Sequence, residues 1–181
     1  MNKLKVSISA RLYDHHGHLV RKYRPKAAHS FLAQFIEYLY IQMSQTQTDV
    51  TKTDGSDYNV IPAILNLSVN APASDLNYGL LIGSGTDPVT IDDYVLQSQI
   101  TSDLTVLAHT FSLSYPSSNT RRLSISRTFT NTSLSPMSIE EVVLYTIYAG
   151  LMYFCLDRTL YSVSIPASSS LTLTYRIDVS I

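Results

Sequence analysis

The last twelve residues of the chain alternate strictly between apolar and polar side chains. The apolar positions are Leu171, Leu173, Tyr175, Ile177, Val179 and Ile181, and the polar positions between them are Thr172, Thr174, Arg176, Asp178 and Ser180. Successive side chains of a β-strand point to opposite faces, so this pattern predicts one long strand with an apolar and a polar face. Such a strand needs partner strands and a second layer over its apolar face. The segment 170–181 therefore predicts a layered β-sheet protein.

Similar strand patterns, separated by turn signals, fill most of the chain. We expect strands over residues 6–13, 18–23, 77–82, 104–114, 121–130, 139–147, 151–157, 159–165 and 171–181. From residue 104 onward, turn signals recur roughly every 8–14 residues, which is typical of an antiparallel sandwich or barrel. Parallel pairing needs helical crossovers, and we find none there. The sequence predicts a mainly β protein with an antiparallel, jelly-roll-like β-sandwich.

One segment has a helical period instead. Residues 30–44 carry apolar side chains at three- and four-residue spacing, with Ser30 placed as an N-cap. We therefore expect one amphipathic α-helix near the N-terminus. We treat residues 1–181 as a single domain: 1–45 form an N-terminal hairpin plus the helix, 46–59 form a protruding hairpin arm that turns at Asp54-Gly55, and 76–181 form the sandwich core.

Composition narrows the classes of partner. Only 15% of the 181 residues are charged, against about 25% in an average domain, and the net charge is −1. This balance lacks the broad basic field of a nucleic-acid-binding protein, so we expect no direct nucleic-acid partner. No apolar run approaches the ~20 residues that span a bilayer, so we expect no membrane partner. The N-terminus lacks a signal-peptide core, which indicates synthesis in a cytoplasm.

Two polar clusters are candidate metal sites, and both have a simpler interpretation. His15, His16 and His18 surround one turn and could hold a transition metal, although a solvated turn explains them as well. The carboxylates of Asp87, Asp92 and Asp93 could bind calcium, or could cap a hydrogen-bonded loop. We favour the solvated turn and the capped loop.

Catalytic signals are absent from the sequence. Gly83-Ser84-Gly85 follows a predicted strand, but the third glycine and the lysine of phosphate-binding loops are missing, so we expect a tight turn. Glu140 and Glu141 are adjacent and would face opposite sides of a strand. The single cysteine, Cys155, excludes an intrachain disulfide and a multi-cysteine zinc site, and we expect a buried, inert thiol. We predict no enzyme activity, no catalytic residue and no cofactor.

Tyrosine is abundant, with 13 residues, whereas tryptophan is absent. Tyrosine is enriched at protein interfaces because it buries a large area and keeps a polar tip. The candidate subunit-contact residues are Tyr13, Tyr23, Tyr38, Tyr40, Val50 and Tyr58.

Three segments together resemble a known group of proteins. The motif residues are Arg24-Pro25, Ala28, Ser30-Phe31 and Phe35, then Tyr78-Gly79, Ile82-Gly83-Ser84-Gly85-Thr86, Ile91, Asp93-Tyr94, Leu96 and Ile100, and finally Ser126 to Asn131, Ile139, Glu141-Val142, Leu144-Tyr145, Arg158, Leu171, Leu173, Tyr175 and Ile177. Together they resemble a family of small structural proteins of tailed viruses, over nearly the whole chain.

The resemblance implies a non-enzymatic virion protein with a β-sandwich core. It implies other virion proteins as partners, a homo-oligomer, and a place in the virion after synthesis in the host cytoplasm. Capsid, collar and tail positions all stay open. The alternative is a carbohydrate- or receptor-binding module of a tail or fibre that uses exposed tyrosines, although the absence of tryptophan argues against a sugar platform.

Overall fold

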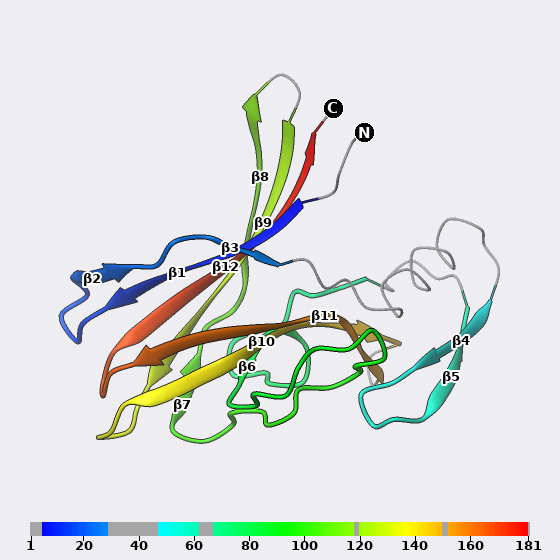
Figure 1. Ribbon diagram of the computed structural model, residues 1–181, viewed down its shortest axis with the longest axis horizontal. Coiled ribbons are helices and arrows are strands. Elements are labelled where there is room, and N and C mark those ends of the chain that lie inside the picture. The colour runs from blue at the N-terminus through cyan, green and yellow to red at the C-terminus, as the bar shows by residue number, and fades with distance from the viewer. Residues whose placement is uncertain (1–4, 29–46, 62–66, 118–119, 150–151, 181) are drawn as a thin grey trace.

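The computed structural model describes residues 5–28, 47–61, 67–117, 120–149 and 152–180, and these residues form strands and no helix (Figure 1). The strands are β1 (Lys5–Tyr13), β2 (Leu19–Lys22), β3 (Lys26–Ala28), β4 (Thr48–Thr51), β5 (Asp57–Val60), β6 (Gly79–Gly83), β7 (Leu104–Val106), β8 (Thr110–Ser117), β9 (Thr120–Asn131), β10 (Met137–Tyr148), β11 (Met152–Ile165) and β12 (Ser170–Ser180). The helix predicted over 30–44 lies outside the described residues. Within the described ranges, no helix is long and apolar enough to cross a membrane.

The C-terminal strand occupies the middle of a seven-stranded antiparallel sheet. The strand order is β2-β1-β12-β9-β7, with β3 also paired to β1 and β8 also paired to β9. Tyr175 of β12 lies between Ile8 of β1 and Ile125 of β9. The alternation of residues 170–181 thus identified a central strand, and its apolar face points into the protein.

A second antiparallel sheet, of order β11-β10-β6, covers that apolar face. One buried cluster joins the two sheets: Ile8, Ile125 and Leu173 come from the first, and Leu80 and Val142 come from the second. The prediction of a mainly β, antiparallel protein is confirmed, and the shared core gives it a sandwich-like arrangement.

The two strands predicted over 151–157 and 159–165 differ from the structure, in which Met152–Ile165 form one strand, β11. Asp157 and Arg158 resemble a turn in the sequence, yet both are buried in the middle of the strand. The loop of residues 84–99 covers the outer face of the second sheet, where Leu96 packs against the buried Cys155. Both faces of β11 are therefore covered at this point, and polar side chains are buried there with partners.

Residues 104–114 also differ, since the single predicted strand is divided into β7 and β8. His109, expected inside a strand, lies in the connection between them and is buried. Its Nε2 atom accepts a hydrogen bond from the Leu80 N–H at 2.8 Å, and its Nδ1 atom is 3.0 Å from the Ala71 carbonyl oxygen. Burial lowers the pKa of His109 to about 4, so the ring is neutral at pH 7, as the acceptor role of Nε2 requires.

The predicted hairpin arm is present as the two-stranded sheet β4–β5, which lies at the edge of the molecule in Figure 1. Val50 and Val60 lie on one face of the hairpin and pack against Tyr148 and Phe154, at the β10–β11 turn. Two strands alone are marginally stable in water. These apolar contacts therefore anchor the arm to the sandwich.

A buried carboxyl group in the shared core makes stability depend on pH. Asp157 lies opposite Leu144 in the β10–β11 ladder and is only 2% exposed. Burial raises the pKa of Asp157 to about 7, and the neighbouring Tyr175 and Thr159 oppose this only in part. An unfolded aspartic acid has a pKa near 3.9. Between about pH 4 and 7 the folded state therefore holds a proton that the unfolded state has lost, and stability falls as pH rises through this window.

Asp157→Asn is expected to remove this pH dependence, because the amide has no proton to lose. At pH 8 the variant should exceed the wild type in free energy of unfolding by about 1–3 kcal/mol, and the difference should shrink toward pH 5. Urea denaturation at pH 5, 6.5 and 8 measures this, with the exposed Asp92→Asn as a control. If the free energy of unfolding changed with pH by the same amount in the wild type and in Asp157→Asn, Asp157 would not be the source of the pH dependence.

Candidate binding surfaces

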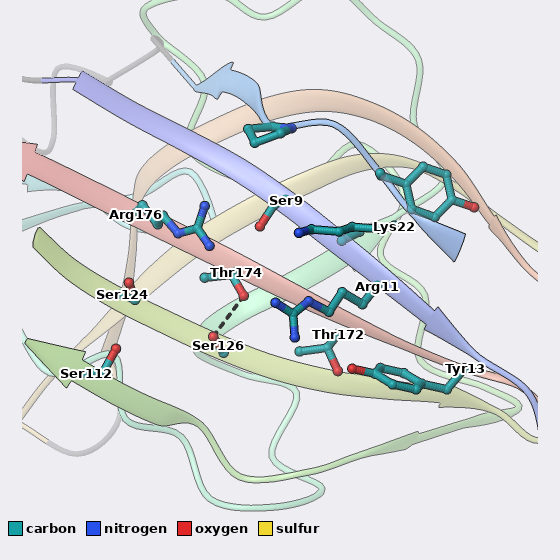
Figure 2. A pocket seen from close by; sticks show the side chains of 13 residues that line it. Ser9, Arg11, Tyr13, Lys22, Ser112, Ser124, Ser126, Thr172, Thr174 and Arg176 are labelled. Atoms are coloured by element: carbon teal, nitrogen blue, oxygen red, sulfur yellow. Dashed lines mark hydrogen bonds between the residues drawn. The ribbon is translucent and has the colours of Figure 1, made fainter. Parts of the chain in front are cut away.

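A groove of about 460 Å³ lies on the outer, polar face of the seven-stranded sheet. Its side chains come from β1, β2, β12, β9 and β8, and Figure 2 shows Arg11, Lys22 and Arg176 over a floor of serines and threonines. These residues alternate with the core residues of the same strands, so the pattern that builds the core also builds this face. We call it the cationic groove.

Hydroxyl pairs across the strands form the floor of the cationic groove and extend beyond it. Three pairs bridge β9 and β12: Ser126–Thr174 at 2.9 Å, Thr128–Thr172 at 2.8 Å and Thr130–Ser170 at 2.8 Å. Cross-strand pairs of this kind stabilise a sheet. They also fix the hydroxyl groups in place, so the floor is rigid and polar.

Among the described side chains, the cations of the groove have no counter-charge. Arg11 lies directly opposite Lys22 in the β1–β2 ladder, and Arg176 lies between Ser7 and Ser124. Neither an ion pair nor a hydrogen bond links any of these three side chains to another described residue, and none of the described side chains that line the groove is a carboxylate. Like charges directly opposite each other are destabilising. The groove therefore suits an anionic group.

The hairpin carries the opposite charge on its outer face. Asp49 pairs with Asn59, and Asp57 pairs with Thr51, on the face opposite to Val50. Asn59 Nδ2 donates to Asp49 Oδ1 at 3.0 Å, and Thr51 Oγ1 donates to Asp57 Oδ1 at 2.9 Å. Asp54 occupies the tip. We call Asp49, Asp54 and Asp57 the acidic hairpin face.

The residues predicted to contact other subunits do not form one surface in the structure. Tyr13 and Tyr23 line the cationic groove. Tyr58 is 36% exposed, and its ring packs 5.6 Å from the ring of Tyr148. Val50 is buried within the chain, where it anchors the hairpin. Tyr38 and Tyr40 lie outside the described residues.

The candidate metal clusters have ordinary structural roles here. The backbone N–H groups of His16 and His18 donate to Asp14 Oδ1, which closes the turn. Asp93 accepts hydrogen bonds from Thr90 and Arg158. Across the described ranges, no group of three or more histidine, cysteine, aspartate or glutamate side chains is arranged to hold a metal ion.

Sequence reasoning missed a buried ion-pair cluster. Arg158 Nε donates to Glu141 Oε2 at 2.7 Å, and Arg158 Nη1 donates to Asp93 Oδ2 at 2.7 Å. Glu141 Oε1 accepts the N–H groups of Gly85 at 3.1 Å and Ser98 at 2.9 Å. Burial alone would lower the pKa of Arg158, but these carboxylates raise it. The cluster fixes the 84–99 loop to the second sheet.

A second missed residue is Arg127, which points into the protein and is 1% exposed. Its guanidinium donates to five backbone carbonyl oxygens, those of Pro72, Asp75, Tyr78, Leu80 and Leu107. Burial lowers the pKa of Arg127 to about 10, so the side chain stays charged at neutral pH. Arg127 therefore holds the 72–80 segment against the first sheet.

Several residues of the viral-protein resemblance meet in the ion-pair cluster. Gly83, Gly85, Asp93, Glu141 and Arg158 come from three separate parts of the sequence. A Cβ atom added at Gly83 would lie 2.6 Å from the Ser98 carbonyl oxygen, and one added at Gly85 would overlap Gln97 Cβ, so glycine is needed at both positions. The joint occurrence of these residues in the resemblance was the sequence signal that could have indicated the ion-pair cluster. In the structure they hold the 84–99 loop against the second sheet.

The fold and these surfaces define the class of the protein, which is a mainly β protein built of antiparallel sheets. No family model, curated protein or solved structure matches the chain.

Proposed function

We propose that the protein is a non-enzymatic structural subunit that assembles by protein–protein contacts into a homo-oligomer. Following the resemblance, we place it in the virion of a tailed virus, on the capsid, collar or tail, with other virion proteins as partners. We also propose that the sandwich is jelly-roll-like, since the first and last long strands, β1 and β12, are neighbours in one sheet.

The observation that carries this proposal is the anchored hairpin. One face of β4–β5 is held on the sandwich by Val50 and Val60, while Asp49, Asp57 and Asn59 are exposed. In Figure 1 the arm stands out from the two facing sheets. A fixed, projecting arm presents a defined surface to another subunit without a large ordering entropy on binding.

Shortening the arm is expected to dissociate the oligomer. Replacing residues 51–57 by Asn-Gly keeps the Val50–Tyr58 pair and closes the hairpin with a two-residue turn. Native mass spectrometry should find a homo-oligomer for the full chain and mainly monomer for the shortened chain. Leu134→Ser, at a 94% exposed turn position, is the control that should remain assembled. A full chain that is monomeric at every concentration would contradict the proposal.

A second candidate function is a carbohydrate- or receptor-binding module, and the cationic groove favours it. Fixed hydroxyl groups, three cations and the rings of Tyr13 and Tyr23 line a cavity of about 460 Å³, in the range of small-ligand sites. A glycan array that includes neutral and acidic sugars tests this candidate. A clean array with no bound sugar would eliminate it.

A further inference from the structure

We infer that the acidic hairpin face of one copy docks into the cationic groove of a second copy. This inference rests on the proposed homo-oligomer, and it assigns the two surfaces that meet.

The groove supplies half of the complementarity. Arg11 and Lys22 repel each other across the β1–β2 ladder, and the described lining of the groove contains no carboxylate that would relieve this repulsion. Arg176 lies four residues along β12 from Thr172, the partner of Arg11, which is about 13 Å at 3.3 Å per residue. An incoming carboxylate would remove the repulsion, so the groove gains more from an anion than an isolated cation would.

The hairpin supplies the other half. Asp49 and Asp57 each use Oδ1 for a hydrogen bond within the hairpin, which fixes the carboxylate and leaves Oδ2 without a partner among the described residues. The two residues lie in adjacent rows of one face, about 7 Å apart along the strands. At the tip, hydrogen bonds from Ser56 and then Lys52 lower the pKa of Asp54 to about 2, and the Lys52 ammonium group, 3.0 Å from Asp54 Oδ2, already balances this charge. Asp49 and Asp57 are therefore the main carboxylates that the hairpin offers to a partner. These carboxylates fit within the span of the groove cations.

The pairing of the strands under the groove determines whether an occupant binds through backbone or side-chain groups. The central strands of the groove, β1, β12 and β9, are paired on both sides, so their backbone groups cannot accept another strand, whereas β2 and β8 at its sides each pair with one described strand. An occupant of the groove is therefore recognised by side chains, and charge is the strongest signal available there. A neutral strand would bring no counter-charge to Arg11, Lys22 or Arg176.

The placement of the two surfaces limits the possible symmetries. In Figure 1 the hairpin β4–β5 and the β1–β2 edge beside the groove lie at opposite ends of the molecule, so the two surfaces of one copy do not meet. A head-to-tail contact between these patches generates a closed ring or an open filament, whereas two antiparallel copies that each dock their hairpin in the other's groove form a two-fold dimer. Each of these assemblies suits a repeated structural subunit.

Charge reversal tests this contact with two variants. The groove variant carries Arg11→Glu and Arg176→Glu, and the hairpin variant carries Asp49→Lys and Asp57→Lys. Each variant alone presents like charges at the contact, so its self-association should weaken at least tenfold in sedimentation at 50 mM NaCl. An equimolar mixture should assemble again, because each groove then meets a hairpin of opposite charge. Recovery on mixing also shows that both variants are folded.

A matched control changes the same number of charges elsewhere. Asp92→Lys with Glu140→Lys alters residues off the hairpin and should leave assembly unchanged. The wild-type oligomer should also dissociate between 50 and 500 mM NaCl, since exposed charges are screened beyond about 10 Å at 0.1 M salt.

The remaining outcomes separate the inference from the proposal that it rests on. A wild-type chain that stays monomeric overturns both. A wild-type oligomer that neither variant weakens overturns the docking alone. If the groove variant stays assembled but loses binding of a heparin hexasaccharide that the wild type binds, the groove is a sulfated-carbohydrate site, and the docking is again overturned.

Discussion

Replacing Arg158 with methionine is expected to lower the free energy of unfolding by about 3–5 kcal/mol. The substitution leaves the Glu141 carboxylate, which is fully buried, without its ion-pair partner, and breaking a buried pair from one side has a cost of this size. It also releases Asp93 and the carbonyl oxygen of Asp87, so the 84–99 loop should lose its attachment to β11. Urea denaturation monitored by circular dichroism measures the loss.

The double variant Glu141→Leu with Arg158→Met separates the ion pair from simple packing. It removes both charges together, so the stability loss should be smaller than that of Arg158→Met alone. Arg176→Met, in the exposed groove, is the control and should change stability by less than about 0.5 kcal/mol. A loss below about 1 kcal/mol for Arg158→Met would show that the pair does not hold the loop.

Arg127→Met is expected to have a comparable effect, of about 3–5 kcal/mol, for a different reason. Five backbone carbonyl oxygens lose their shared donor, and each buried acceptor left unpaired costs about 1–3 kcal/mol unless water reaches it. Hydrogen exchange should show faster exchange of the Leu80 amide, which is bonded to His109 in the same region. Arg127→Lys keeps the charge but has fewer hydrogen-bond donors. Its free energy of unfolding should lie between those of the wild type and Arg127→Met. Unchanged protection at Leu80 would contradict this role.

Much of the fold could be predicted because strand alternation is a local signal. The alternation of residues 170–181 identified a central strand, and Asp54-Gly55 marked the turn of the hairpin. The division of residues 151–165 into two strands was wrong, because Asp157-Arg158 looks like a solvated turn. The partners of Arg158 come from distant parts of the sequence: the 84–99 loop covers that position and supplies Asp93, and strand β10 supplies Glu141.

The candidate surfaces could be predicted only in part. Tyr13, Tyr23 and Tyr58 were named from the interface preference of tyrosine, and the first two line the groove. The charged residues beside them were not singled out. Arg11, Lys22 and Arg176 become neighbours only through the pairing of β2 with β1 and of β1 with β12, which joins the two ends of the chain. No local pattern encodes that register.

Cross-linking with a carbodiimide, which joins lysine to nearby carboxylates, tests assembly through the two surfaces most directly. A mixture of unlabelled and ¹⁵N-labelled chains distinguishes links between copies from links within one. We predict that Lys22 of one isotope is joined to Asp49, Asp54 or Asp57 of the other in the assembled protein. An assembled sample in which Lys22 is never joined to the hairpin of another copy would contradict this account.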